Sequence, residues 1–362
     1  MAVKIAKKST AKETVGVLDM LKTFQKDKGD SIGSVGGQLV NATRIPTGLF
    51  PLDLALGGGF PRGKVTSIFG PESSNKTNIA LRAIAMHQML WPELLCVFVD
   101  LENEFNPEWA ALLGVDTSRL VVLKPAYAEE CVDLVEGMLH AHDVGLVVLD
   151  SIAAMVSTAE LEKSAEGAIV GGVGTIIGKL YRKTIAAFIE AEKQGRYPSL
   201  FYINQITTKI GVMFGNPETE PGGNKPRFQS TIRLRVHGAN VLDKTVSDVM
   251  PVAKEVNFVV KKWKTPILAA SGKFVMATQP HKGLQIGQCD DFNTVSEYLK
   301  AYGKFEKGEK NKGWDIYGEH YDTIAPFKER LYGDPMFGSQ VRQFIINTML
   351  KQGVLEEGDT EK

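Results

Sequence analysis

Short apolar runs alternate with stretches of helical spacing between about residues 43 and 284. Four of these runs are the segments 64–69 (KVTSIF), 94–100 (LLCVFVD), 145–150 (GLVVLD) and 200–205 (LFYINQ). A continuous apolar strand is buried on both faces, and strands separated by helices are typical of a parallel sheet covered on both sides. The pattern therefore predicts an α/β fold over residues 41–284, with a mostly parallel sheet and helices on both faces.

The pattern changes beyond about residue 228. The segments 230–236, 255–262 and 272–279 are rich in strand-forming residues, and we expect them to extend the sheet with antiparallel pairs. After residue 284 the chain is lysine-rich and mixed in pattern, which favours a small α+β C-terminal domain over 285–362. Its last seven residues (EEGDTEK) hold four acids and one lysine, and they predict a disordered acidic tail.

The first forty residues predict a separate element. Val15, Val17, Leu18, Leu21 and Phe24 recur at helical spacing, which indicates an amphipathic helix with one apolar face. The glycine-rich segment that follows is a flexible connection, so the helix need not pack on its own core. We expect region 1–40 to pack against a neighbouring subunit.

Composition narrows the class of protein. Forty-two basic residues balance forty-two acidic ones, so the chain lacks the bulk positive field of a histone-like protein, and any contact with nucleic acid must be local. The three cysteines are an odd number without a CxxC pair, which argues against a disulfide framework and a cysteine-rich zinc site. No apolar run reaches the roughly 18–20 residues of a membrane span. A cytoplasmic protein without a membrane partner is expected.

A phosphate-binding loop is the strongest local signal. The segment 70–77, here called the phosphate loop, joins an apolar strand to a helical run, so its backbone N–H groups and the helix dipole favour an anion. It consists of Gly70, Pro71, Glu72, Ser73, Ser74, Asn75, Lys76 and Thr77. Following the mechanics of GxxxxGK[ST], Lys76 would reach the β- and γ-phosphates and Thr77 would ligate Mg²⁺. Asn75 stands at the second glycine position, where it tolerates a positive φ less freely than glycine. The alternative is an ordinary strand-to-helix turn.

Carboxylates follow two other predicted strands. Asp100 and Glu102 come just after one strand, and Asp150 and Ser151 end another. Nucleotide sites in open α/β sheets lie at the carboxyl ends of the strands, where these side chains are expected. Asp150 suits a Mg²⁺ site, and Glu102 suits the orientation or deprotonation of an attacking water. A helix N-cap is the alternative for Glu102.

Several segments closely resemble the bacterial and phage RecA strand-exchange recombinases. They are 47–65 (TGLFPLDLALGGGFPRGKV), 70–77 (GPESSNKT), 100–116 (DLENEFNPEWAALLGVD), 147–155 (VVLDSIAAM) and 203–228 (INQITTKIGVMFGNPETEPGGNKPRF). The resemblance covers roughly residues 10–285 and weakens beyond them. It implies a RecA-like ATPase core with an N-terminal oligomerisation helix, ATP and Mg²⁺ as cofactors, and assembly as a helical filament on single-stranded DNA. Homologous double-stranded DNA is the second implied partner.

The resemblance also implies roles for residues around the nucleotide. Lys76 and Thr77 look like the phosphate and Mg²⁺ residues, Glu102 like the catalytic carboxylate, and Asp150 like the Walker B acid. Trp109 falls where the family stacks an aromatic ring on adenine, and Gln205 looks like the sensor that links the γ-phosphate to the following DNA-binding loop. A core tryptophan and a buried strand-end amide are the alternatives for these two residues.

Two DNA-binding loops are implied in the same way. Segment 206–226 resembles the second loop, in which Lys209 and the backbone N–H groups of Gly211, Gly222 and Gly223 would bind phosphates, and Ile210 would insert between base triplets. Thr207 and Thr208 depart from the more basic bacterial pattern. The first loop corresponds by position to about 160–175, with Val170 as its candidate residue.

Further residues are implied at subunit interfaces. Phe228 looks like the aromatic side chain that packs into the neighbouring subunit, with an ordinary core phenylalanine as the alternative. Lys262 and Lys264, or Lys261 with an offset of one residue, resemble the basic pair that reaches the neighbour's ATP. A solvated strand end is the alternative for the lysines.

These features together indicate an ATP-dependent recombinase that polymerises on single-stranded DNA and catalyses homologous pairing and strand exchange. One alternative is a DNA motor with the same core, such as a ring helicase. The other is a single-strand binding protein in which Asn75 has abolished hydrolysis.

Overall fold

The computed structural model describes residues 16–28, 43–161, 172–208, 218–221, 225–246 and 249–358. The chain divides into two compact units, 1–41 and 42–362. In the first unit, helix α1 (Val17–Lys28) provides the amphipathic helix expected from the pattern. Val17, Leu18 and Phe24 are exposed on it. Its packing on a neighbouring subunit stays a prediction, as do the predicted domain boundaries.

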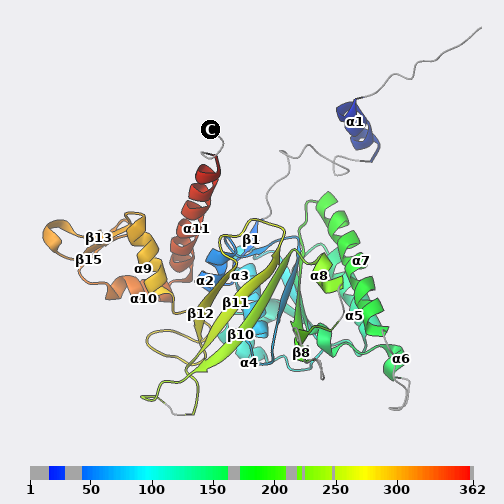
Figure 1. Cartoon of the computed structure of the whole chain (residues 1–362), viewed down its shortest axis with the longest axis horizontal. Helices are drawn as coiled ribbons and strands as arrows, with labels where there is room; N and C mark the ends of the chain where they lie inside the picture. The colour runs from blue at the N-terminus through cyan, green and yellow to red at the C-terminus, as the bar shows by residue number, and fades with distance from the viewer. Residues whose placement is uncertain are drawn as a thin grey trace, which may run out of the picture. The chain divides into compact units, whose positions relative to one another are not determined.

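The second unit is built on an eight-stranded sheet, with the order β12-β11-β10-β3-β7-β6-β4-β5. Figure 1 shows β12, β11 and β10 next to one another at one edge of this sheet. Its strands are β3 (Val65–Gly70), β4 (Leu95–Asp100), β5 (Leu120–Leu123), β6 (Val144–Asp150), β7 (Ser199–Gln205), β10 (Ile232–Val241), β11 (Ala253–Trp263) and β12 (Ser271–Ala277). The pairs from β10 to β5 are parallel, whereas β11 runs antiparallel to both β10 and β12. The predicted parallel core and its antiparallel extension are therefore confirmed.

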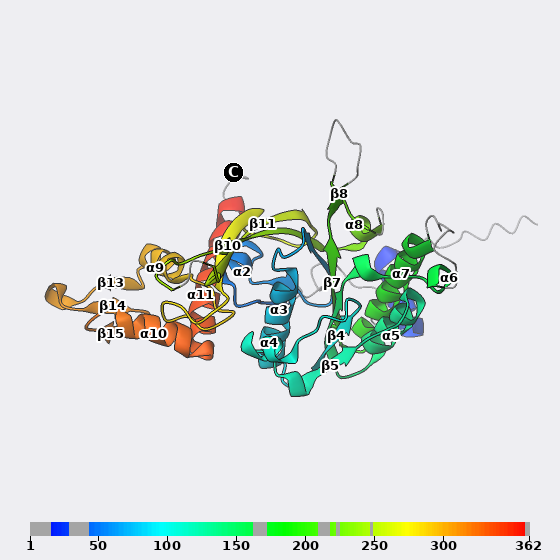
Figure 2. The same ribbon diagram turned by 90° about the horizontal axis from the view of Figure 1, so that it is seen from below.

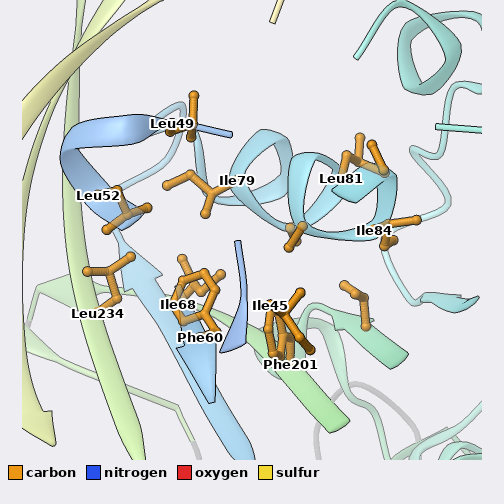
Figure 3. Close-up of a cluster of buried hydrophobic side chains, with 14 of the residues drawn as sticks. Ile45, Leu49, Leu52, Phe60, Ile68, Ile79, Leu81, Ile84, Phe201 and Leu234 are labelled. Atoms are coloured by element: carbon orange, nitrogen blue, oxygen red, sulfur yellow. The ribbon is translucent and has the colours of Figure 1, made fainter. Parts of the chain in front are cut away.

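Helices cover both faces of the sheet, as predicted. Figure 2 shows α3 (Lys76–Leu90) on one side of β7 and β4, and α5 (Ala128–His140) with α7 (Gly172–Lys193) on the other. Successive side chains of a buried strand point to opposite faces of the sheet, so the strand contributes to a hydrophobic cluster on each face. In β4, for example, Phe98 faces the α3 side, whereas Val97 faces α5 and α7. Figure 3 shows the α3-side cluster, in which Phe60 and Phe201 stack edge to face. This two-sided burial is the physical reason for the continuous apolar runs in the sequence.

The C-terminal region is a small α+β structure, as predicted, and it packs around a hydrophobic cluster that it shares with Phe50 and Leu54 of the preceding part of the chain. It contains α9 (Phe292–Ala301), β13 (Phe305–Lys307), β14 (Trp314–Ile316), β15 (Glu319–Tyr321), α10 (Ala325–Gly333) and α11 (Pro335–Gly358). Helix α11 is described as far as Gly358, and the disorder of the acidic tail stays a prediction. Residues 359–362 lie outside the described part of the chain.

Shorter elements connect these structures. They are β1 (Arg44–Ile45), α2 (Phe50–Ala55), β2 (Phe60–Pro61), α4 (Pro107–Leu112), η3 (Thr117–Arg119), η4 (Ile152–Ala154), α6 (Thr158–Leu161), β8 (Thr207–Thr208), β9 (Glu218–Thr219), α8 (Lys225–Gln229) and η5 (Glu309–Asn311). Among the described helices, none combines the length and apolar composition that a membrane crossing requires.

Candidate nucleotide site

The phosphate loop joins β3 to α3 at the carboxyl end of the parallel strands. Ser73 and Asn75 have positive φ values of 55° and 76°, so the loop turns back on itself before α3 begins. Gly70 is required by close approach, because an added Cβ would lie 2.1 Å from the carbonyl oxygen of Val236. Asn75 thus adopts the left-handed conformation that glycine would adopt at lower cost. The loop keeps its turn despite the substitution.

Lys76 is the buried cation of this loop. Its Nζ donates a hydrogen bond to the carbonyl oxygen of Pro71 at 2.6 Å. Burial lowers the pKa of Lys76, while the nearby carboxylates of Asp150, Glu102 and Glu72 act in the opposite direction. The loop therefore combines N–H groups at a helix N-terminus with a lysine ammonium group, which suits a polyanionic ligand.

Asp150 lies in the most crowded part of the site. Its Oδ2 accepts a hydrogen bond from Thr77 Oγ1 at 2.6 Å. Burial raises the pKa of Asp150 to about 7, and the charges of Glu102 and Asp100 add to this increase against the opposing effects of Thr77 and Lys76. The Asp150 carboxylate and the Thr77 hydroxyl are oxygen ligands of the kind that a hard divalent cation such as Mg²⁺ prefers.

The raised pKa of Asp150 predicts a pH-dependent stability of the ligand-free protein. Between about pH 4 and 7 the native state keeps a proton that the unfolded chain releases, so the free energy of unfolding falls as pH rises through this window. The full decrease is on the order of 2–4 kcal/mol. Urea denaturation at pH 5, 6 and 8 without divalent ions would measure it. We expect Asp150→Asn to have a flatter profile, and identical profiles for the two proteins would contradict this assignment.

Glu102 faces the same edge of the sheet. Its Oε1 accepts hydrogen bonds from Ser151 Oγ and from Gln205 Nε2, the latter at 3.1 Å. The alternative of a helix N-cap is wrong, because the N-cap of α4 is Asn106, whose side chain accepts from the backbone N–H of Trp109. Sequence reasoning assigned no role to Ser151, although its position directly after Asp150 was a usable signal. Side chains at the ends of β6 and β7 thus both donate to the carboxylate of Glu102.

Asp100 has a different place from its neighbours. Its two carboxylate oxygens accept hydrogen bonds from the backbone N–H groups of Glu104 and Phe105, at 3.1 and 3.0 Å. Asp100 therefore holds the turn that carries Glu102 after β4. Its negative charge helps to raise the pKa of Asp150, while its oxygens accept hydrogen bonds from the backbone.

Trp109 lies on α4 and is half-buried against the α3-side core. Its indole Nε1 donates to Asn78 Oδ1 at 2.8 Å. Asn78 is in the first turn of α3, immediately after the phosphate loop. The candidate base-stacking residue is therefore physically connected to the loop that precedes α3.

Lys254 was missed by the sequence analysis. It lies on β11, and its Nζ donates to the carbonyl oxygen of Ser73 in the phosphate loop. A Cβ at Gly238 on β10 would lie 3.3 Å from Lys254 Cδ and 3.2 Å from Ser74 Cα, so the glycine leaves room for this approach. The contact spans 181 positions in the sequence. No local pattern could have revealed it.

Lys262 and Lys264 lie at the other end of β11. Lys262 Nζ donates to the carbonyl oxygens of Arg227 and Phe228 at 2.6 and 2.8 Å, and Lys264 Nζ lies 3.4 Å from that of Phe228. The register of β10 and β11 shifts here by a bulge: Arg233 pairs with Lys262 and Leu234 with Val260, which leaves Lys261 without a partner in the register. The structure does not bring these lysines to the phosphate loop of their own chain. Eight residues separate Lys254 from Lys262, which is about 25 Å along a strand.

Phe228 lies on α8 and is 69% exposed. The alternative of an ordinary core phenylalanine is therefore wrong. Its packing into another subunit stays a prediction. The residues proposed to contact DNA, namely Val170, Lys209, Ile210, Gly211, Gly222 and Gly223, lie outside the described residues.

The described ends of segment 206–226 are held close to β7. Thr207–Thr208 pairs with Glu218–Thr219, and Asn204 Nδ2 donates to the carbonyl oxygen of Pro221 at 3.1 Å. Glu220 then makes a buried ion pair with Arg233, whose Nη2 lies 2.5 and 2.6 Å from the two carboxylate oxygens. The segment therefore starts and returns next to Gln205.

We expect Glu220→Ala to lower the free energy of unfolding by about 3–5 kcal/mol, because Arg233 would keep a buried charge without its partner. Urea denaturation would measure the loss. The matched control is Glu255→Ala, which removes an ion pair with the exposed Lys273 and should cost less than about 1 kcal/mol. Replacement of both Glu220 and Arg233 by methionine should recover much of the loss. Equal losses for Glu220→Ala and the control would contradict the importance of the buried pair.

Comparison with known proteins agrees with this geometry. Residues 16–279 match the family described as the RecA N-terminal domain. The chain is 39% identical over 258 residues to Protein RecA of Symbiobacterium thermophilum, covering 70% of this chain and 71% of the relative. It is 35% identical over 303 residues to Protein RecA of Thermus aquaticus, covering 83% and 84%, and 33% identical over 300 residues to that of Mesoplasma florum, covering 82% and 86%. A phosphate loop, a parallel sheet and a match over most of the chain lead to one conclusion: the chain belongs to the RecA family of recombinases.

Proposed function

We propose that this chain is a DNA-dependent ATPase that polymerises on single-stranded DNA as a helical filament and catalyses homologous pairing and strand exchange. The observation that carries the proposal is the hydrogen bond from Gln205 to Glu102. It links the carboxylate suited to hydrolysis with the strand that leads directly into segment 206–226. A change in that segment on DNA can therefore alter the position of Glu102.

In this proposal the phosphate loop binds the phosphates of ATP through its backbone N–H groups and Lys76. Thr77 and Asp150 would hold Mg²⁺, which supplies charge neutralisation on the phosphates when bound. Glu102 orients the attacking water and accepts its proton, while Ser151 and Gln205 fix the carboxylate. Trp109 provides a ring face for the adenine base.

Lys262 and Lys264 would act on the ATP of a neighbouring subunit. Their place about 25 Å along β11 from Lys254 argues against a role in their own site. A cation supplied by a neighbour stabilises transferring phosphate charge only after assembly, as an arginine finger does. Hydrolysis would then require the filament, to which Phe228 and α1 would contribute exposed apolar contacts.

DNA binding in this proposal depends on Lys209, Ile210 and the backbone N–H groups of Gly211, Gly222 and Gly223, with Val170 in the first loop. Such backbone-directed contacts bind phosphates without reading sequence. Base pairing between strands would supply the recognition of homology. A cytoplasmic location is part of the proposal and is supported by Cys96, Cys131 and Cys289, which are all free and buried.

The test is steady-state ATP hydrolysis with single-stranded DNA, with double-stranded DNA and without DNA, followed by a strand-exchange assay and electron microscopy. We expect strong stimulation by single strands, joint DNA molecules and open filaments. Closed rings would indicate the DNA motor instead. ATP-dependent DNA binding without turnover would indicate the hydrolysis-deficient binding protein.

A further inference from the structure

Two asparagine side chains connect Trp109 to the phosphate loop. Trp109 Nε1 donates to Asn78 Oδ1 at 2.8 Å, and Asn78 Nδ2 donates to Asn75 Oδ1 at 2.7 Å. Asn75 Nδ2 in turn lies 3.7 Å from the sulfur atom of Met276 on β12. Each amide accepts on the side of Trp109 and donates on the other side. The three contacts therefore form one consistently directed chain, in which neighbouring hydrogen bonds strengthen one another.

The position of Asn75 explains why this row of hydrogen bonds can form. Asn75 is the N-cap of α3 and Asn78 is its third helical residue, so their side chains lie on neighbouring positions of the first turn. An N-cap asparagine usually accepts from a backbone N–H of that turn, but the Asn75 side chain makes no such capping bond. Its oxygen accepts from the Asn78 side chain instead. The backbone N–H groups of the loop stay available for an anion.

The three linked contacts differ in how far they are buried. Asn75 is 7% exposed, whereas Asn78 and Trp109 are half-buried, so this row of hydrogen bonds runs from the core to the edge of the site. The backbone N–H of Trp109 donates to Asn106 Oδ1, its carbonyl oxygen accepts from the Leu113 N–H, and its ring packs against the α3-side core. Among the described residues, Asn78 is thus the side chain whose hydrogen bond to the indole N–H restricts rotation of the ring about the Cβ–Cγ bond of Trp109. A fixed ring loses less conformational freedom when a base stacks on it.

We propose that Asn78 is a positioning residue that orients the indole ring of Trp109 for stacking on the nucleobase, and that Asn75 holds Asn78 in this orientation. The proposal deepens the proposed function and rests on ATP binding at this site. Asn75 then connects the base site to the phosphate loop, a role that glycine could not perform. Because the indole N–H is engaged by Asn78, Trp109 offers the base its ring face only. The orientation of Trp109 should therefore favour the binding of any purine nucleotide.

The test compares binding of ATP, GTP and inorganic tripolyphosphate by calorimetry, on the full chain without DNA. Tripolyphosphate has the phosphates but lacks a base, so it isolates the phosphate loop. We expect Asn78→Ala to weaken ATP and GTP about three- to tenfold, as for one lost neutral hydrogen bond. Tripolyphosphate binding should change less than about twofold. Asn75→Gly, which suits the backbone φ of 76°, should weaken the two nucleotides in the same direction by a smaller factor.

The matched control is Asn347→Ala on α11, which removes an asparagine whose Oδ1 accepts from Gln343 on an exposed surface. It should bind all three probes as the unmodified chain does. Thermal unfolding of each variant separates a loss of fold from a loss of binding. A second measurement is independent of fold: in a Trp109→Phe background, which has a ring but lacks the N–H, Asn78→Ala should cause no additional loss of ATP affinity.

The outcomes distinguish this assignment from the proposed function. Equal losses of ATP and tripolyphosphate in Asn78→Ala, or additive losses with Trp109→Phe, would overturn the assignment alone. Unchanged ATP affinity in Asn78→Ala would also overturn it. If the unmodified chain bound no ATP, both the proposed function and the assignment would be overturned.

Discussion

Glu102→Gln is expected to reduce the rate of ATP hydrolysis stimulated by single-stranded DNA by about 10²- to 10⁴-fold, the usual contribution of a general base. The amide oxygen can still accept from Ser151 and Gln205, so the side chain keeps its position while losing its basicity. ATP binding should persist, because the phosphate loop and Lys76 are unchanged. The measurements are kcat with saturating DNA and the ATP dissociation constant.

Glu104→Gln is the matched control for this experiment. Glu104 is exposed on the same turn, and its backbone N–H donates to Asp100 Oδ1. Its side chain can change without altering that bond, so hydrolysis should stay near the unmodified rate. A Glu102→Gln protein that hydrolysed ATP normally would remove Glu102 from the reaction. The search for the base would then turn to the other carboxylates at this edge.

Replacement of both Lys262 and Lys264 by alanine should lower the DNA-stimulated rate by about 10³-fold or more, the effect expected of a cation supplied across an interface. ATP binding to the separated subunits should be retained, since the pair lies far along β11 from its own phosphate loop. Lys273→Ala on β12, which removes an exposed ion-pair lysine, is the control and should hydrolyse ATP normally.

Mixing two inactive proteins shows whether the lysines act between subunits. In a mixture of Glu102→Gln with the double lysine variant, some interfaces combine an intact Glu102 on one subunit with intact lysines on its neighbour. Partial recovery of DNA-stimulated hydrolysis is therefore expected. Two inactive proteins that stay inactive when mixed, although they form filaments together, would place the lysines outside the neighbour's site.

Much of the fold could be predicted from local patterns. The strand around residues 145–150 is apolar at the consecutive positions 146–149 because both of its faces are buried, so the sequence pattern and the packing have the same cause.

The candidate site was predictable where it depends on short segments. Lys76 and Thr77 follow a strand and begin a helix, and this local geometry suffices to place them beside a phosphate. Phe228 shows the limit of such reasoning, because an aromatic residue in a short segment can face the core or the solvent. Its 69% exposure is set by how α8 packs after segment 206–226, which no periodicity encodes.

Local patterns suffice to predict the parallel core, the phosphate loop and the family resemblance, because strand burial, turn chemistry and motif spacing are properties of neighbouring residues. Which distant side chains meet depends on how the strands are arranged in the folded sheet. Strand order brings Gln205 and Ser151 to Glu102, and the approach of β11 brings Lys254 to Ser73. A bulge of one residue moves Lys262 into register with Arg233. Such contacts depend on the order, register and approach of strands far apart in the chain, which are set by packing of the whole sheet and leave no local pattern.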